Sequence, residues 1–185
     1  IKKNTSYVVF GNGLGSFKIN KKITIDSSNA GTLTRLLFGL LSTYPNKVKI
    51  TGDRSLKKRP MERVIKPLEK IGCTFYPKNK KNLPLEICGT SMPLAKKHIE
   101  QLGSAQVKSA LIYSALNTPG ITEIEERKIS RDHTERMLKF IGAKIKIKKL
   151  NKGRLISIKG QEELNSFNLK IPGDPSSAAF FIVLT

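Results

Sequence analysis

A chain of 185 residues is long enough for one domain with a sizeable hydrophobic core, or for one domain and part of another. No apolar run reaches membrane-spanning length, and the first residues lack the apolar region and cleavage site of a signal peptide. The cysteines, Cys73 and Cys88, have neither CxxC spacing nor histidine companions. These features exclude an obvious membrane or secreted protein, and predict a soluble cytoplasmic protein without a metal ion or other cofactor.

The formal net charge of +20 allows three interpretations. Lysine and arginine can neutralise the phosphates of a nucleic acid. However, the lysines are scattered through turns and strand exteriors, aromatic residues make up only 6% of the chain, and tryptophan is absent, so base-stacking surfaces are scarce. A solvated lysine-rich surface and a site for a small polyanionic substrate therefore remain alongside nucleic-acid binding.

The first glycine-rich segment, residues 11–17 (GNGLGSF), predicts a turn. It follows an apolar strand, but Ser16 stands where a dinucleotide-binding loop would have its third glycine. No capped helix follows either, so dinucleotide binding is not expected.

Helices are predicted after three clusters of small polar residues. The segments are SSNAGTLTRLLFGLL from Ser27, GSAQVKSALIYSAL from Gly103 and DPSSAAFFIVL from Asp174. Hydroxyl and amide side chains at these starts are expected to cap the unpaired N–H groups of the first turn. The first two helices are each followed by a turn and a strand-like run, 44–53 and 117–126.

A second kind of element alternates with these helices. Residues 59–78 and 130–149 each predict a capped amphipathic helix that ends at Ile-Gly and continues into an alternating strand. A further short strand follows each, at 83–89 and 154–160. The sequence therefore predicts an α/β chain in which a βαβαββ unit of about seventy residues occurs about twice, with parts of other units at both ends.

The helix starts suggest binding sites for anions. A helix N-terminus carries unpaired N–H donors and a partial positive charge, and small residues let a ligand approach the backbone. One candidate site comprises Asn29, Gly31 and Thr32, and another comprises Ser104, Ala105 and Gln106. The alternative is that these residues are only good helix caps.

Two basic loops add to this pattern. In residues 52–60, Arg59 directly precedes Pro60 at a helix entry, where its guanidinium can bind a carboxylate or phosphate with two parallel bonds. In residues 128–136, Ser130 and Arg131 precede the next helix. Solvated, charged helix ends are the alternative here. His98 and His133 have no metal-ligand partners at useful spacing, and neither is expected to be catalytic.

Five motifs in this order resemble the enolpyruvyl transferase family, in the branch that acts on shikimate 3-phosphate: NAGTLTR, GDRSLKKRPM, GSAQVKSAL, SRDHTERML and PGDPSSAAFF. The resemblance implies a two-domain inside-out α/β barrel. Each half has three βαβαββ units, with helices inside and sheets outside. Residues 1–172 would form the N-terminal domain, incomplete at its N-terminus, and residues 173–185 the crossover and the truncated first helix of the C-terminal domain.

The resemblance also implies a reaction and its substrates. The enolpyruvyl group of phosphoenolpyruvate would move to the 5-hydroxyl of shikimate 3-phosphate, with release of phosphate. The implied phosphoenolpyruvate-binding residues are Asn29, Gly31, Thr32, Arg59 and Gln106. Those implied for shikimate 3-phosphate are Ser104, Ala105, Gln106, Ser130 and Arg131. The expected partners are these two small anions, without nucleic acid or membrane, and the complete protein is expected to be monomeric.

The sequence departs from the family pattern at two positions. Leu36 follows Arg35 where some members have proline, and Ala105 stands where others have serine. Because the chain begins at Ile1 and stops within an apolar segment, we expect a fragment of a longer protein. The family's acid–base residues would lie outside it, so we expect no catalytic residue in this fragment and no turnover by it alone.

Two other functions remain as alternatives. A UDP-N-acetylglucosamine enolpyruvyl transferase usually carries a reactive cysteine in this half, whereas Cys73 follows a helix-ending glycine and Cys88 lies in a predicted strand. A nucleic-acid-binding module on the same repeated fold would account for the positive charge.

Overall fold

The computed structural model describes residues 2–3, 6–17, 19 and 21–184. The first repeat unit consists of β3 (Ile23–Asp26), α1 (Gly31–Leu41), β4 (Lys47–Thr51), α2 (Glu62–Glu69), β5 (Thr74–Tyr76) and β6 (Leu85–Cys88). The second consists of β7 (Lys97–Glu100), α3 (Ala105–Leu116), β8 (Ile121–Glu126), α4 (His133–Phe140), β9 (Ile145–Lys149) and β10 (Arg154–Lys159). Outside the units lie β1 (Lys2–Lys3), β2 (Ser6–Tyr7) and α5 (Pro175–Ile182), and the short 3-10 helix η1 (Leu56–Lys58) lies within the first unit. The predicted α/β class and βαβαββ repeat are confirmed.

The two units build sheets with the same topology. Their strand orders are β3-β4-β6-β5 and β7-β8-β10-β9. In each sheet the first two strands pair in parallel, and the other pairs are antiparallel. A parallel pair requires a crossover connection, which α1 supplies in the first unit and α3 in the second. Helices α1 and α3 therefore occupy equivalent positions in their units.

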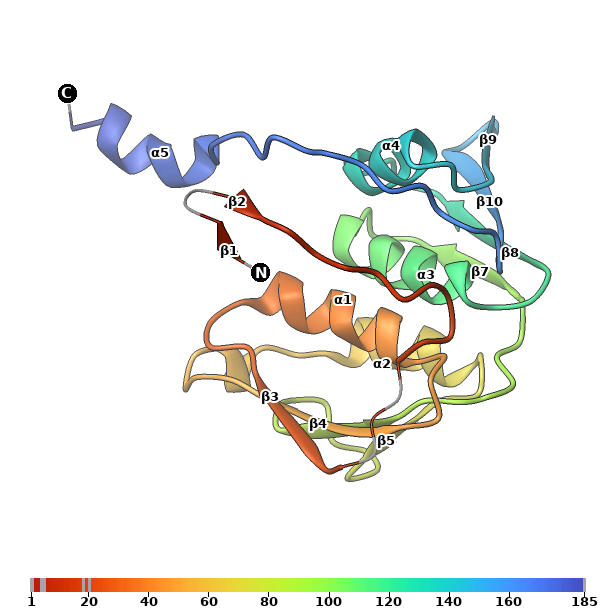
Figure 1. Cartoon of the computed structure of the whole chain (residues 1–185), viewed down its shortest axis with the longest axis horizontal. Helices are drawn as coiled ribbons and strands as arrows, with labels where there is room; N and C mark the ends of the chain where they lie inside the picture. The colour runs from red at the N-terminus through yellow and green to blue at the C-terminus, as the bar shows by residue number, and fades with distance from the viewer. Residues whose placement is uncertain (1, 4–5, 18, 20, 185) are drawn as a thin grey trace.

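Helices α1 and α3 pack against each other between the two sheets (Figure 1). At their starts the Nε2 of Gln106 donates to Thr32 Oγ1 at 2.7 Å. At their ends the Nδ2 of Asn117 donates to the carbonyl of Thr43 at 3.3 Å. The helices thus run in the same direction, and their N-termini lie side by side.

Glycine permits the close approach of these two helices. A Cβ placed on Gly39 of α1 would lie 2.1 Å from the carbonyl oxygen of Ala110 in α3. A second pair of glycines has matching roles in the two units. A Cβ on Gly89, after β6, would lie 2.2 Å from the carbonyl oxygen of Leu41, and one on Gly160, after β10, would lie 2.4 Å from that of Ala115. The last strand of each unit therefore returns directly onto the end of its first helix.

The helix-ending glycines lie where the sequence predicts them. Gly72 follows α2 with a φ of 111°, and Gly142 follows α4 with a φ of 98°. These left-handed conformations cost glycine little, because it has no Cβ. They turn the chain sharply from each helix into the next strand.

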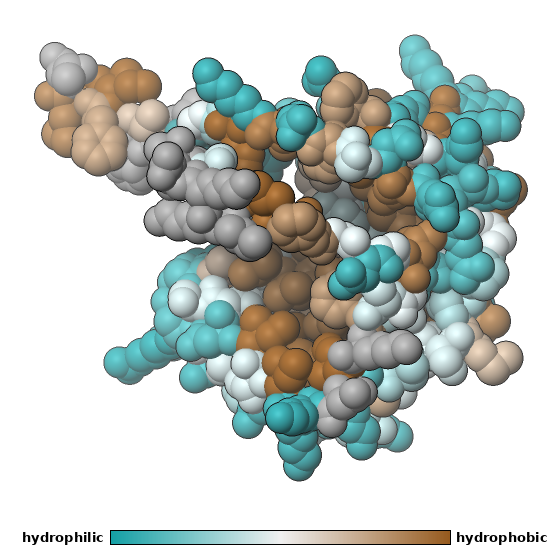
Figure 2. Space-filling model, in the orientation of Figure 1, coloured by the Kyte–Doolittle hydropathy of each residue, from teal (hydrophilic) through white to brown (hydrophobic). Residues whose placement is uncertain are grey.

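The inner faces of both sheets and the helices between them form one hydrophobic core, which includes Phe38, Ile50, Ile87, Ile124 and Ile156. Lysines occupy exposed positions of the strands, as at Lys47 and Lys49 in β4. Figure 2 shows one side of the molecule, with hydrophilic residues around its rim and hydrophobic residues gathered in a central hollow. Much of the positive charge is therefore spread over the outside.

The segments outside the two units are less buried. The predicted glycine turn is confirmed, with Gly13 and Gly15 both at positive φ. Residues 161–174 form an extended connection past α4 to α5, which stands apart from both sheets (Figure 1). Within the described residues, no helix combines the length and apolar character needed to cross a membrane.

His98 makes the stability of the fold sensitive to pH. It lies in β7 with 5% of its surface exposed, and its Nε2 has no hydrogen-bond partner among the described residues. Burial, together with the charges of Lys70 and Lys96, lowers the pKa of His98 to about 4 from its usual 6.5. The unfolded chain therefore binds a proton between these pH values that the folded chain does not bind.

We expect the free energy of unfolding to fall as the pH drops from 6.5 to 4, with up to about 3 kcal/mol of the loss due to His98. Urea unfolding across this range should show a shallower dependence on pH for His98→Gln than for the wild type. His133→Gln, at an exposed position, is the control for replacing a histidine by glutamine. Parallel curves for the wild type and His98→Gln would contradict the prediction.

Candidate functional site

The starts of α1, α2 and α3 meet at one end of the molecule. The contact between Gln106 and Thr32 joins the first turns of α3 and α1. Arg35 of α1 links both neighbours: its Nη1 donates to Gln106 Oε1 at 2.8 Å, and its Nη2 lies 3.4 Å from the carbonyl of Pro60, just before α2. Each helix start contributes a partial positive charge, so their convergence favours an anion.

No side chain among the described residues caps the start of α1, contrary to the sequence-based prediction. The N-cap residue is Ala30, whose side chain has no acceptor. The neighbouring Asn29 is used elsewhere, because its Nδ2 donates to Asp53 Oδ2 at 2.6 Å and its Oδ1 accepts from Arg59 Nη2 at 2.7 Å. Among the described residues, the first turn of α1 is therefore left without a side-chain acceptor.

Asp53 anchors this network from the loop after β4. Its Oδ1 accepts from the backbone N–H of Leu56 at 2.7 Å. That bond and the one from Asn29, together with the charge of Arg59, hold the pKa of Asp53 below its usual value. The carboxylate thus orders the residues that carry Arg59 into the site.

The start of α3 is capped as predicted. The Oγ of Ser104 accepts from the backbone N–H of Val107 at 3.3 Å. The carboxylate of Glu100 accepts from the N–H groups of Gly103 and Ser104 at 2.6 and 3.1 Å. Ser104, Ala105 and Gln106 therefore stand on a well-fixed turn beside the start of α1.

Three arginines surround this junction: Arg35, Arg59 and Arg63. A Cβ on Gly31 would lie 3.1 Å from the Nη1 atoms of both Arg35 and Arg59, so both guanidinium groups reach the first residue of α1. Burial, and after it the positive charges of Arg59 and Arg63, lowers the pKa of Arg35. Among the described residues none of the three arginines forms an ion pair. Such a concentration of like charge calls for an anionic ligand.

Arg35 is not among the site residues predicted from the sequence. A signal was present, because Arg35 is the only charged residue of α1 and lies four positions after Gly31. This spacing places it on the face of Gly31. Asn29, Gly31, Thr32, Arg59 and Gln106 do lie together, with Arg35 at their centre.

The loop before α4 carries Ser130 and Arg131. It lies beside the start of α3, because a Cβ on Gly103 would be 3.1 Å from the Cγ of Lys128. The backbone N–H and Oγ of Ser130 both donate to Glu126 Oε1, at 2.8 and 2.5 Å. The guanidinium of Arg131 is exposed and makes no hydrogen bond or ion pair with the other described residues.

The predicted capping of the second helix of each unit is wrong within the described residues. Met61 precedes α2 and has no side-chain oxygen. Asp132 precedes α4 but does not accept a hydrogen bond from it. In the second unit, Ser130 of the entry loop donates to Glu126 instead. The carbonyl groups of Ser130 and Arg131 accept from Arg154 and Lys108. The buried charged residues that take part, none of them predicted from the sequence, are Lys108, Glu126, Glu135 and Arg154.

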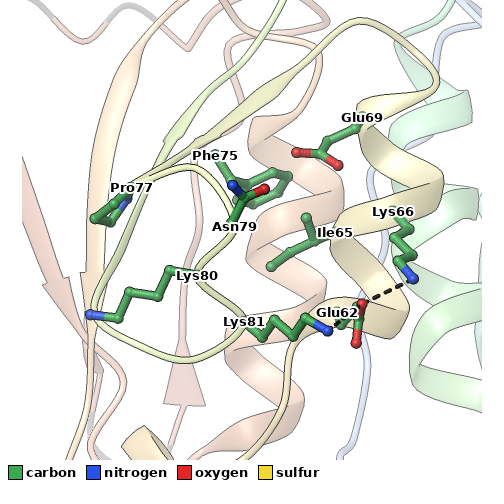
Figure 3. Close-up of a pocket in the computed structure, with 9 residues that line it drawn as sticks. All are labelled: Glu62, Ile65, Lys66, Glu69, Phe75, Pro77, Asn79, Lys80 and Lys81. Carbon is green, nitrogen blue, oxygen red and sulfur yellow. Dashed lines mark ion pairs between the residues drawn. The ribbon is translucent and has the colours of Figure 1, made fainter.

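A separate cavity of about 160 Å³ lies between α2 and the loop after β5 (Figure 3). Glu62 points toward two lysines, with its Oε1 at 2.9 Å from the Nζ atoms of both Lys66 and Lys81. Hydrogen bonds from Lys66 and then Lys81 lower the pKa of Glu62. These lysines are already paired, so the cavity is a weaker candidate for an anion site than the arginine junction.

Cys73 lacks the surroundings of a reactive thiol. Cys73 is buried, and burial raises the pKa of its thiol to about 12. A reactive cysteine needs a lowered pKa and access to solvent. In the part of the chain that the structure describes, no three or more His, Cys, Asp or Glu side chains group as a metal site would require.

Comparison with known proteins identifies the family. The profile of EPSP synthase (3-phosphoshikimate 1-carboxyvinyltransferase) matches residues 1–185. The 3-phosphoshikimate 1-carboxyvinyltransferase of Acidiphilium cryptum is 43% identical over 94% of this chain and 39% of its own length. That of Novosphingobium aromaticivorans is 43% identical over 95% of this chain and 40% of its own length.

A solved structure agrees with these relatives. EPSP synthase from Acinetobacter baumannii, at 2.37 Å, is 38% identical, with a TM-score of 0.74 over 86% of this chain and 35% of its own. The chain spans about two fifths of the length of the curated relatives that it matches. These matches do not favour the UDP-N-acetylglucosamine or nucleic-acid-binding alternatives. The family profile matches the whole length of the chain, and its relatives and its fold agree with that match. The chain therefore belongs to the EPSP synthase family.

Proposed function

We propose that this chain forms the substrate-binding N-terminal part of an enzyme that transfers the enolpyruvyl group of phosphoenolpyruvate to the 5-hydroxyl of shikimate 3-phosphate. The observation that carries the proposal is the junction of two parallel helix starts with Arg35, Arg59 and Arg63, none of them paired with a described carboxylate. Both substrates are small and strongly anionic, as this junction requires.

The proposal includes the setting of the protein. Residues 1–172 form the N-terminal domain, and residues 173–185 form the crossover and the first helix of the C-terminal domain. Ile1 and Thr185 lie outside the described residues. The complete enzyme is a cytoplasmic monomer.

The phosphoenolpyruvate site comprises Asn29, Gly31, Thr32, Arg59 and Gln106. Asn29 orients Arg59 through a 2.7 Å hydrogen bond. Gly31 leaves space where two guanidinium groups converge. Arg35 joins this set, because it reaches both Gly31 and Gln106. Guanidinium groups bind carboxylate and phosphate with paired hydrogen bonds, and phosphoenolpyruvate carries both groups.

The shikimate 3-phosphate site comprises Ser104, Ala105, Gln106, Ser130 and Arg131. The exposed guanidinium of Arg131 supplies charge, and the backbone N–H of Ala105 replaces a missing hydroxyl. The hydroxyl hydrogen of Ser130 can turn from Glu126 to a phosphate oxygen, because the N–H of Ser130 continues to hold that carboxylate. Gln106 belongs to both sets and lies where the two substrates meet.

The chemical contribution of this chain is to bring two anions together. The arginines and helix starts offset their mutual repulsion and stabilise the charge on the departing phosphate. Asp53, the carboxylate bound to Asn29, is used in holding the loop, so proton transfer is assigned to no residue of this chain.

The proposal is tested by titrating the purified chain with shikimate 3-phosphate and then phosphoenolpyruvate while following backbone amide shifts. Shifts should cluster at residues 29–32, 104–106 and 130–131. Arg59→Ala should weaken phosphoenolpyruvate binding by about 10- to 100-fold, the worth of a charge-assisted hydrogen bond. Arg54→Ala, in the same loop, is the matched control and should bind as the wild type does.

The alternative function predicts a different result. If neither substrate shifts these amides, while arbitrary oligonucleotides bind in a strongly salt-dependent way, the proposed function is wrong. Equal losses in Arg59→Ala and Arg54→Ala would show only a diffuse effect of charge.

A further inference from the structure

Four charged side chains form a buried ion cluster beneath the loop that carries Ser130 and Arg131. They come from four elements: Lys108 from α3, Glu126 from β8, Glu135 from α4 and Arg154 from β10. The side chains of Lys108, Glu126 and Glu135 are 0% exposed and that of Arg154 is 12% exposed. With two positive and two negative groups, the cluster is neutral overall.

The charges of the cluster are closely paired. The Nζ of Lys108 lies 2.8 Å from Glu135 Oε1 and 3.2 Å from Glu126 Oε1. Arg154 uses Nε for Glu126 Oε2 at 2.5 Å and Nη2 for Glu135 Oε1 at 3.1 Å. Burial alone would raise the pKa of Glu126, but hydrogen bonds from Ser130 and Arg154 and the charge of Lys108 outweigh it and lower that pKa.

The cluster also binds the main chain of the loop. Lys108 Nζ donates to the carbonyl of Arg131 at 2.8 Å, and Arg154 Nη2 donates to that of Ser130 at 3.2 Å. Glu126 accepts from the N–H of Ser130 at 2.8 Å. Two successive carbonyl groups and one N–H are thus held by charged groups, while the guanidinium of Arg131 is left unpaired among the described side chains.

Stability alone does not explain why Lys108 is buried in α3. Burying charges costs desolvation energy, and apolar residues of similar volume are often as stabilising as a buried ion pair. The repeat provides an internal comparison, because Lys108 is the fourth residue of α3 and Thr34 is the fourth residue of α1. Thr34 is equally buried and bonds to its own helix through Ala30. The first unit therefore builds the same helix without a lysine.

We propose that Lys108 is a positioning residue for the anion site. With Glu126, Glu135 and Arg154, it fixes the main chain at Ser130 and Arg131, so that the guanidinium of Arg131 is held beside the start of α3. The cluster makes no contact with substrate itself. This inference rests on the proposed function, because it assigns Arg131 to shikimate 3-phosphate.

The test is the double variant Lys108→Met with Glu135→Leu in the 185-residue chain. It removes one charge of each sign, keeps the pair of Glu126 with Arg154, and releases the carbonyl of Arg131. Lys97→Met is the control, because Lys97 pairs with Glu125 at 2.8 Å on an exposed surface of the same unit. Circular dichroism and amide spectra establish that each variant is folded.

We expect the double variant to bind shikimate 3-phosphate about 10- to 100-fold more weakly, because a small misplacement of a binding group has effects of this size. The shifts of Gly31 and Arg59 with phosphoenolpyruvate should match the wild type, which a general structural defect would not allow. Amide relaxation should show increased motion at residues 130–132 in the double variant and not in Lys97→Met.

The outcomes separate the two proposals. If the wild type binds shikimate 3-phosphate and the double variant binds it equally well, the positioning role is wrong. If the wild type shows no response to shikimate 3-phosphate, the proposed function is wrong. The positioning role of the cluster is then tested by the relaxation data alone. In that case, unchanged motion at residues 130–132 would overturn the positioning role.

Discussion

Gly39→Ala is expected to destabilise the fold by about 3 kcal/mol, although alanine is the better helix former. Helix propensity alone favours alanine over glycine by about 1 kcal/mol. However, the new Cβ would lie 2.1 Å from the carbonyl oxygen of Ala110 and 2.6 Å from its Cα. These are backbone atoms, so no side-chain rotation relieves the clash, and α1 and α3 must move apart. The cost belongs at the upper end of those measured for overpacked cores.

Urea unfolding of the wild type and Gly39→Ala measures this effect. Gly11→Ala is the control, because a Cβ there meets nothing within 4 Å. It should unfold at nearly the wild-type urea concentration. A midpoint for Gly39→Ala at or above that of the wild type would mean that the two helices do not approach each other as closely as described.

The single variant Lys108→Met should cost about 3–5 kcal/mol of unfolding free energy at neutral pH. It leaves Glu126 and Glu135 buried with Arg154 as their only remaining partner in the cluster. The loss should shrink as the pH is lowered, because protonation of one carboxyl group relieves the excess negative charge. Adding Glu135→Leu should recover most of the stability by removing that charge directly.

Thermal or urea unfolding at two pH values checks this prediction. Lys97→Met breaks an exposed ion pair and should differ little from the wild type. If Lys108→Met were as stable as the wild type at neutral pH, or if the double variant recovered nothing, the buried charges would not depend on one another as their distances indicate.

The repeat could be predicted because its signals are local. Ile-Gly at the end of a helix, alternating strands and small residues at helix starts are each read within a few positions, and Gly72 and Gly142 have the predicted left-handed conformation. The sites implied by the resemblance also fall on ordered loops and helix starts. Local patterns thus sufficed for the order of the elements and for the end of the molecule where ligands are proposed to bind.

The partners of the polar side chains could not be predicted in the same way. Asn29 is of the right type for a helix cap and lies next to the N-cap position, but its two polar atoms bind Asp53 and Arg59, from a loop more than twenty residues away. Lys108 has the sequence pattern of a charged residue on a helix surface, but in the fold it is buried against Glu126 of β8 and Glu135 of α4. Such choices depend on tertiary contacts, which a local pattern does not contain.

The parallel packing of α1 and α3 has a consequence for how the protein unfolds. Each sheet covers the helices of its own unit, but Gly39 of α1 packs directly against the buried Ala110 of α3. Separating the units would expose the inner helices of both, so neither unit can open while the other stays intact. The most protected amide hydrogens of the two units should therefore exchange with solvent at a common rate, as one cooperative block of about 140 residues assembled from two copies of one pattern.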